Sequence, residues 1–399
     1  MKNPKLFDLT RKHNMSAPQT ILHHRVLPSS SNSVGYFPNQ TVDFILQVPQ
    51  RKLLSGSIRI EGTVTVTKGA TVEEILVTDN CKLDNMVGAH SFFDQMSTEV
   101  ESKGMLETLQ NYPRYISMQS KASMSQDDMC VLSMGAELRG PKNDNGKYAL
   151  QAVVERSDDG VGTGTETSPS SFSFKPMVCF NRSQGNMYSF DKMGFIRVSC
   201  ILARNADAFF GKDVFGAAGV NCQYTLKDLA LRFVTIPEDG ESGPQLMRSY
   251  ISTVNSVQST SSSLVSRVPS SRVNGVAVSF CKQTDLQSPD ANSLALQTVP
   301  DFLSTEYLFS NSVNQNITYT IKDRSDAIAR GIQALSDSGH HQASIQTLQS
   351  RNGFLLGVPF GQFIDLSQQL FSMRLDVTST TITSTPLSAF SMFSTLIEL

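Results

Sequence analysis

Hydrophobic and polar residues alternate with a period of two in short runs along most of this chain. In the first half, these runs lie at Thr41–Val48, Ser57–Thr67, Glu73–Thr78, Tyr148–Val154, Gly194–Ala203 and Tyr224–Ile236. They resume in the second half at Ser271–Phe280, Asn316–Lys322, Phe354–Val358, Leu370–Thr378 and Pro386–Leu399. Such alternation turns one face of a strand towards a core and the other towards water or a partner. The sequence therefore predicts an all-β protein in which one strand-rich module follows another.

Helical signals are few. Between Asp326 and Ser336 apolar residues recur at helical spacing, Ser325 or Asp326 can cap the N-terminus, and Gly339 can end the helix. Gly62 interrupts the second predicted strand, where we expect a bulge or a bend.

One further stretch gives a mixed signal. Leu106, Leu109 and Tyr112 have helical spacing, but Pro113 interrupts it, and the pattern between residues 105 and 118 assigns no element.

Four segments follow from these patterns. Residues 1–35 form a basic N-terminal arm, in which Lys2, Lys5, Arg11 and Lys12 lie among polar residues and prolines. Such a segment buries too little apolar surface to fold alone, so it is either a disordered tail or a tether that orders against a neighbour, a membrane or a genome. Residues 36–237 form the first β module, 238–266 a linker, and 267–399 the second β module. The Ser-rich linker is expected to be a short helix followed by a flexible link.

Composition narrows the class of protein. Charged residues make up only 18% of the chain, below the usual fraction of about 25%. A surface low in charge suits a protein covered by its neighbours, although strands favour Ser and Thr in any case. The net charge is −2, which gives no overall attraction to nucleic acid or to an anionic membrane.

The cysteines favour a reducing site of synthesis. Six are widely spaced, at Cys81, Cys130, Cys179, Cys200, Cys222 and Cys281, and no apolar signal-peptide region precedes them. We expect buried, reduced thiols and synthesis in the cytoplasm without secretion.

No catalytic, cofactor-binding or metal-binding residue is predicted. The loop Gly140–Lys147 resembles a phosphate loop, but its glycines are one residue too far apart and Tyr148 replaces the Mg²⁺-binding hydroxyl. The pairs His23-His24 and His340-His341 lack metal-ligand spacing. A Cys81/His90 dyad rests on proximity in sequence alone. The paired acids Asp127-Asp128 and Asp158-Asp159 lie in turn-rich stretches typical of solvated loops, and the chain contains no Trp for stacking on sugars.

Seven stretches, taken in order, carry a resemblance to a known family. They are Phe44–Val66, Met86–Gly104, Phe195–Gly211, Tyr224–Pro237, Arg267–Phe280, Pro300–Ile321 and Gly353–Val377. The His-Ser-Phe-Phe step at His90 and the Ile-Asp-Leu-Ser step at Ile364 are among their features. In this order the chain resembles the double jelly-roll major capsid proteins of icosahedral DNA viruses, a lineage that includes tailless phages, adenovirus, virophages and polinton-like elements. The resemblance covers residues 40–399, with a second module shorter than the first.

The resemblance implies two consecutive antiparallel jelly-roll β-sandwiches with short helices in loops. It implies a structural protein, not an enzyme, that forms homotrimers with a pseudo-hexameric outline and tiles the shell of a virion. Implied partners are neighbouring capsomers, vertex and minor capsid proteins, and an internal membrane or the genome through Lys2, Lys5, Arg11 and Lys12.

Two alternatives remain open from the sequence. One is a single-roll or minor viral capsid or surface protein. The other is a β-sandwich carbohydrate-binding module or hydrolase, which needs an aromatic or carboxylate cleft that the sequence does not reveal.

Overall fold

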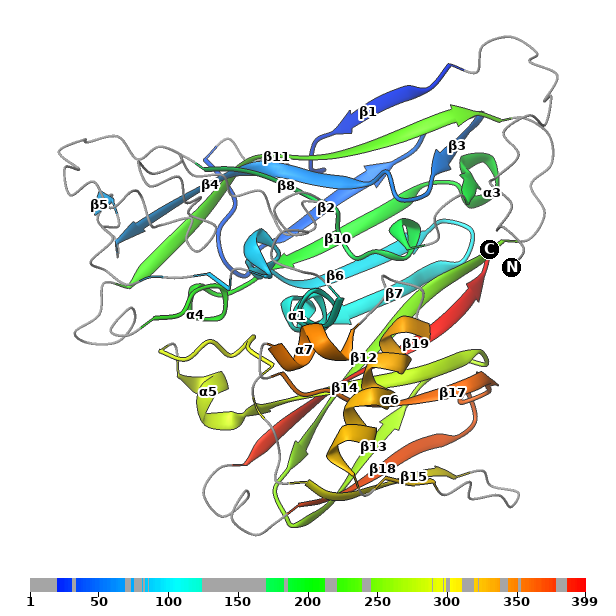
Figure 1. Cartoon of the computed structure of the whole chain (residues 1–399). Coiled ribbons are helices and arrows are strands. Elements are labelled where there is room, and N and C mark those ends of the chain that lie inside the picture. Colours follow the sequence, from blue (N-terminus) through cyan, green and yellow to red (C-terminus); the bar gives the residue numbers. More distant parts are fainter. Residues whose placement is uncertain are drawn as a thin grey trace, which may run out of the picture.

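The structure is a computed structural model of the whole chain. It describes residues 20–30, 34–68, 73–74, 81, 83–84, 86–123, 170–182, 186–211, 221–238, 245–288, 290–296, 298, 302–310, 319–321, 323–337, 344–350, 353–377 and 386–399. Within these residues strands dominate and helices are short, as the alternating pattern predicts (Figure 1).

The strands of the first half are β1 (Leu22–Val26), β2 (Thr41–Leu46), β3 (Arg51–Leu54), β4 (Arg59–Lys68), β5 (Glu73–Glu74), β6 (Phe93–Val100), β7 (Gly104–Gln110), β8 (Ser170–Phe174), β9 (Met187–Ser189), β10 (Ile196–Leu202) and β11 (Cys222–Pro237). Those of the second half are β12 (Leu246–Val257), β13 (Ser261–Arg267), β14 (Val273–Lys282), β15 (Phe302–Ser310), β16 (Tyr319–Ile321), β17 (Leu356–Ile364), β18 (Leu370–Val377) and β19 (Leu387–Glu398). The helices are η2 (Gly88–Phe92), α1 (Tyr112–Ser123), η3 (Cys179–Asn181), α3 (Phe190–Met193), α4 (Asn205–Ala208), α5 (Gln283–Gln287), α6 (Arg324–Asp337) and α7 (Ile345–Ser350).

These strands form three sheets. One holds the order β5-β4-β11-β3-β9, with β1 added to β11 and β8 added to β4. The second is continuous through both halves of the chain, in the order β17-β14-β19-β12-β7-β6-β10-β2. The third holds β13-β18-β15-β16. The molecule is a double jelly roll in which the middle sheet contributes one layer to each sandwich (Figure 1).

The two rolls meet where β7 and β12 lie side by side. These strands run parallel, with Ile251 opposite Thr108. On the far side of β12, an antiparallel ladder with β19 runs from Leu246 opposite Glu398 to Val257 opposite Leu387. The backbone hydrogen bonds of one sheet therefore continue from the first roll into the second.

The predicted period of two is visible in the burial of individual strands. In β10, Ile196, Val198, Cys200 and Leu202 are buried while the residues between them are partly exposed. The bulge predicted at Gly62 lies on the opposite strand. The β4–β11 register shifts between Lys227 and Ala230, across from Gly62, where a Cβ would lie 2.7 Å from Leu229.

The helix predicted at residues 326–336 is α6, which packs on β17 (Figure 1). Two glycines allow this close approach. A Cβ on Gly331 would lie 2.8 Å from the carbonyl oxygen of Leu355, and one on Gly357 would lie 2.8 Å from the Cα of Gly331. Ile328, Ile332 and Leu335 are all buried, which confirms the predicted face.

The structure corrects the expectation for residues 238–266. The predicted short helix and flexible link are wrong, because most of this segment forms β12 and β13, which pair with β19 and β18. Low charge and many Ser residues look alike in a flexible link and in a strand whose hydroxyls face neighbouring strands. Within the segment, Ser262 and Ser266 are buried and Ser249 contacts β19.

The structure also resolves the mixed signal between residues 105 and 118. The helical spacing of Leu106, Leu109 and Tyr112 is misleading, since the first two lie in strand β7 and α1 begins only at Tyr112, with Pro113 in its first turn.

The arm predicted for residues 1–35 includes strand β1, which pairs with β11 from Leu22 opposite Thr235 to Val26 opposite Leu231. Lys2, Lys5, Arg11 and Lys12 lie outside the described residues, as do the strand predicted at Tyr148–Val154 and the loop Gly140–Lys147.

Candidate functional site at the junction of the two rolls

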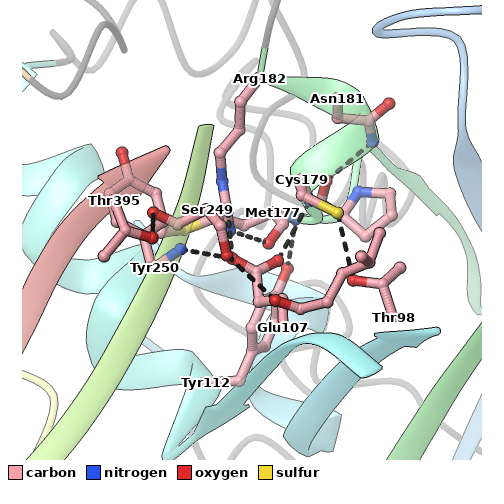
Figure 2. A network of polar contacts seen from close by, with 12 residues as sticks. Thr98, Glu107, Tyr112, Met177, Cys179, Asn181, Arg182, Ser249, Tyr250 and Thr395 are labelled. Carbon is pink, nitrogen blue, oxygen red and sulfur yellow. Dashed lines mark hydrogen bonds and ion pairs between the residues drawn. The ribbon is translucent and has the colours of Figure 1, made fainter. Parts of the chain in front are cut away.

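A buried ion pair sits where the two rolls join. Glu107 lies on β7, next to the β7–β12 contact, and is 4% exposed. Its partner is Arg182, which follows η3 and is also 4% exposed; Nη1 of Arg182 donates to Oε1 of Glu107 (Figure 2). Both charges are therefore removed from water at the seam between the sandwiches.

The remaining acceptor capacity of Glu107 is used by the backbone of both rolls. Oε1 accepts a hydrogen bond from the backbone N–H of Tyr250 on β12 at 2.7 Å, and Oε2 accepts one from Cys179 at 3.1 Å. The Ser249 hydroxyl also donates to Oε1 at 3.4 Å. One carboxylate thus ties β7 and η3 of the first roll to β12 of the second (Figure 2).

Arg182 is held from several sides. Its Nη2 donates to the carbonyl oxygen of Met177 at 2.5 Å, and its guanidinium stacks over the Tyr250 ring at 4.1 Å. Hydrogen bonds of this kind are what allow a buried ion pair to offset the loss of hydration. Burial also raises the pKa of the neighbouring Cys179 thiol to about 12, so this thiol is neutral and serves as a packing group.

A second polar junction lies near α1. The carboxylate of Asp84 accepts from Nζ of Lys121 at 2.5 Å and from Nδ2 of Asn292 at 2.7 Å. Asn292 belongs to the second half of the chain, and Lys121 also donates to the carbonyl oxygen of Leu294 at 2.8 Å. Burial opposes ionisation of Asp84, but Lys121 and Asn292 hold the pKa of this carboxyl below its usual value.

A cleft of about 470 Å³ opens beside this second junction. The β10–α4 turn and Asp94 line one wall, and the start of α1, the segment 285–294 and β19 line the other. Four acids, Asp84, Asp94, Asp207 and Asp285, and two arginines, Arg114 and Arg204, face it. Asp207 is paired with Arg204 at 2.6 Å.

The histidine and the cysteines with a possible chemical role are buried inside the fold. His90 is buried, with its Nδ1 2.8 Å from the Tyr112 hydroxyl and its ring 4.3 Å from that of Phe174. Cys179, Cys200, Cys222 and Cys281 are buried free thiols, as predicted, and Cys81 is buried too. Cys130, His340, His341 and the paired acids at 127–128 and 158–159 lie outside the described residues.

The described residues contain no cluster of three or more His, Cys, Asp or Glu side chains placed to hold a metal ion. Their helices include none of the length and apolar character needed to cross a membrane.

Sequence reasoning missed both junctions. Glu107 lies two positions before Leu109 on the buried face of β7, but the sequence pattern assigned no element to residues 105–118, so the charge gave no signal of a buried pair. Its partner, Arg182, is 75 positions away and cannot be found from periodicity.

No family model matches this chain, and no curated protein matches its sequence. Solved structures do match it. The Faustovirus major capsid protein aligns with a TM-score of 0.60 at 8% identity, covering 99% of this chain and 92% of its own. VP54 of PBCV-1, fitted into a reconstruction of the virophage Sputnik, gives 0.57 at 12% identity, covering 96% and 95%. A chain from the cryo-EM structure of the Sputnik virophage gives 0.56 at 11% identity, covering 100% and 90%. At these identities the likeness shows a shared fold, and it confirms the double jelly roll expected from the sequence.

Proposed function

We propose that this chain is the major capsid protein of an icosahedral virus, a structural protein that assembles with copies of itself. The observation that carries the proposal is the double jelly roll itself, which aligns over 99% of this chain with the Faustovirus major capsid protein. A likeness confined to one roll would fit a single-roll capsid component; here the alignment includes both rolls and the sheet that joins them.

The geometry of the junction supports this role. A building block of a shell transmits load between its lobes, and here the lobes share a sheet and two buried polar junctions. We propose that β12 and β13 belong to the second roll, so that residues 36–237 and the remaining strands form two similar lobes. Three such subunits then give six lobes and a pseudo-hexameric capsomer.

The sheet edges support burial against other copies. β2 and β17 end the continuous sheet, and β13 and β16 end the smallest one. Exposed apolar side chains lie on or next to several of these strands, among them Ile45, Val265 and Phe363. Open edges with apolar side chains favour association, and packing in a shell covers them.

The partners beyond the capsomer follow from the same proposal. Neighbouring capsomers, vertex proteins and minor capsid proteins contact the outer edges of the trimer in the virion. The basic arm with Lys2, Lys5, Arg11 and Lys12 faces the interior and contacts an internal membrane or the genome, because clustered cations are attracted to phosphate.

Light scattering coupled to size exclusion tests the assembly. We expect the purified chain to form a stable trimer or larger species, with hexagonal outlines in negative-stain images. A monomer whose melting temperature rises with added sugars would contradict the proposal and favour a carbohydrate-binding sandwich instead.

Truncation before β1 tests the role of the arm. Removal of residues 1–19 leaves β1 and its ladder with β11 in place. We expect trimers to form normally and particle assembly to be impaired, and substitution of Lys2, Lys5, Arg11 and Lys12 by Gln serves as a matched variant of full length. Normal particles from both variants would show that the arm has no part in assembly.

A further inference from the structure

We propose that the cleft between the two rolls is a binding site for a carboxylate, with Arg114 as the group that receives it. Arg114 lies in the first turns of α1 and lines the cleft wall formed by α1, the segment 285–294 and β19. The carboxylate is carried either by a small organic acid or by an acidic side chain that enters the cleft.

Arg114 is buried, and no described residue forms an ion pair with it. Its side chain is 2% exposed, and its Nε and Nη1 atoms have no hydrogen-bond partner among the described residues. A buried guanidinium with two unsatisfied nitrogens and no opposite charge beside it is strongly destabilising. Its stacking over the Phe390 ring, at 4.7 Å, covers one face of the group and leaves Nε and Nη1 unsatisfied.

The described neighbours of Arg114 do not supply the missing negative charge. Asp84 lines the same cleft, but its carboxylate is engaged by Lys121 and Asn292. The Cys281 thiol forms a hydrogen bond with Arg114, but burial raises the pKa of the thiol more than the guanidinium lowers it, so Cys281 is neutral and supplies no opposite charge. In contrast, the ion pair at the other junction gives Arg182 a carboxylate partner.

The cleft is large enough to hold a ligand. Its volume of about 470 Å³ falls in the range of roughly 300–1,000 Å³ typical of small-molecule sites. Its walls mix apolar side chains such as Leu294 and Phe390 with polar ones such as Asn111 and Ser288. Arg114 is one of the residues that line this space.

The charges around the cleft select the kind of anion. Asp94 and Asp285 face it in addition to the paired Asp84 and Asp207. This acidic rim disfavours a phosphate group or a nucleic-acid backbone, which brings about two negative charges or a run of them. A single carboxylate matches the planar N–H edge of a guanidinium with two parallel hydrogen bonds and adds only one charge.

Thermal unfolding of the full-length protein with added anions tests the site. A ligand that binds only the folded state raises the unfolding temperature in a saturable way. We expect the monocarboxylates acetate, propionate or butyrate to do so, while chloride and sulfate at matched ionic strength do not. If a capped peptide with a central glutamate acts and the free acids do not, the carboxylate comes from an acidic side chain.

Variants make the test specific. Arg114→Met should abolish the saturable rise and Arg114→Lys should weaken it at least tenfold in apparent affinity, since a lysine cannot form the paired hydrogen bonds. Arg204→Met is the matched control, because Arg204 faces the same cleft but is exposed and paired with Asp207, and it should keep the effect.

A variant away from α1 covers the case in which Arg114→Met does not fold. Ala291→Phe narrows the cleft from the 285–294 segment, leaves the Arg114 side chain in place, and should remove the effect from a folded protein. The proposal is overturned if no carboxylate gives a saturable rise in the wild-type protein. It is also overturned if Arg114→Lys and Ala291→Phe respond like the wild-type protein.

Discussion

At the scale of single residues, substitutions at fully buried positions have the largest effect on folding. Leu231 on β11 and Leu375 on β18 are fully buried, each on the apolar face of its strand. Leu231→Asp or Leu375→Asp places an unpaired charge in a core, which costs several kcal/mol against a net stability of about 5–15 kcal/mol. We expect both variants to be insoluble or unfolded by circular dichroism, whereas Gln223→Asp, on the exposed face of β11, should fold normally. Folded, soluble Leu231→Asp protein would refute the face assignment.

The Glu107–Arg182 pair provides a second prediction at this scale. Removing one partner leaves the other charge buried, so Glu107→Ala should lower the free energy of unfolding by roughly 3–5 kcal/mol. Glu99→Ala is the control, because its partner Arg197 and Glu99 itself are 39% and 29% exposed, and such pairs contribute about 0–1 kcal/mol. Urea titrations of both variants measure the difference. Equal effects would mean that the junction contributes no more than a surface pair.

Asp84 makes part of the stability depend on pH. Its pKa is lowered in the folded state, so its contribution is present above the unfolded pKa of about 3.9 and is lost as the pH falls through the folded value. Asp84→Asn should therefore be less stable than the wild-type protein at pH 7, and the gap should close in urea titrations as the pH falls below about 4. A gap that stays constant down to pH 3 would contradict the assigned ion pair.

At the scale of elements, β1 is a strand added to the edge of a sheet that is otherwise built from later residues. Its five residues pair with β11, Arg25 bonds Glu61 at 2.9 Å, and His24 stacks on Phe233 at 4.8 Å. Burial and the positive charge of Arg51 lower the pKa of His24, so this ring is neutral near pH 7.

Two truncations separate β1 from the residues before it. Removing residues 1–27 should lower the unfolding temperature by several degrees, because the β11 edge loses its ladder and its apolar cover. Removing residues 1–19 should leave that temperature unchanged. Differential scanning fluorimetry compares the two, and identical curves would show that β1 adds no stability.

At the scale of the whole molecule, the shared sheet predicts that the two rolls unfold together. Sandwiches joined by a flexible link would unfold independently, but here β7, β12 and β19 are joined by backbone pairing and by two polar junctions. We expect a single cooperative transition in calorimetry with equal calorimetric and van't Hoff enthalpies for the unit that unfolds. Two resolved transitions in the wild-type protein would contradict this.

Sequence patterns located about half of the described strands, because a period of two is a local property. The run predicted at 194–203 is β10 and that at 370–378 is β18, with ends shifted by only a few residues. The helix at 326–336 followed from its apolar face. The predicted caps Ser325 and Asp326 are wrong, because α6 begins at Arg324 and the Asp323 carboxylate accepts the hydrogen bond from the backbone N–H of Ser325. The patterns failed in the Ser-rich segment that forms β12 and β13, because low charge and many serines occur both in flexible links and in strands. They also failed near Tyr112, where helix α1 begins soon after strand β7 ends at Gln110.

The alternation of apolar and polar residues by itself determined the all-β class and, in strands such as β10 and β18, which face is buried, because each of these depends on residues a few positions apart. The pairing of β7 with β12, the burial of Glu107 against Arg182 and the cleft at Arg114 were decided only by the tertiary structure. Each of these features joins residues far apart in the chain, and no local period encodes which distant charge or edge a strand will meet.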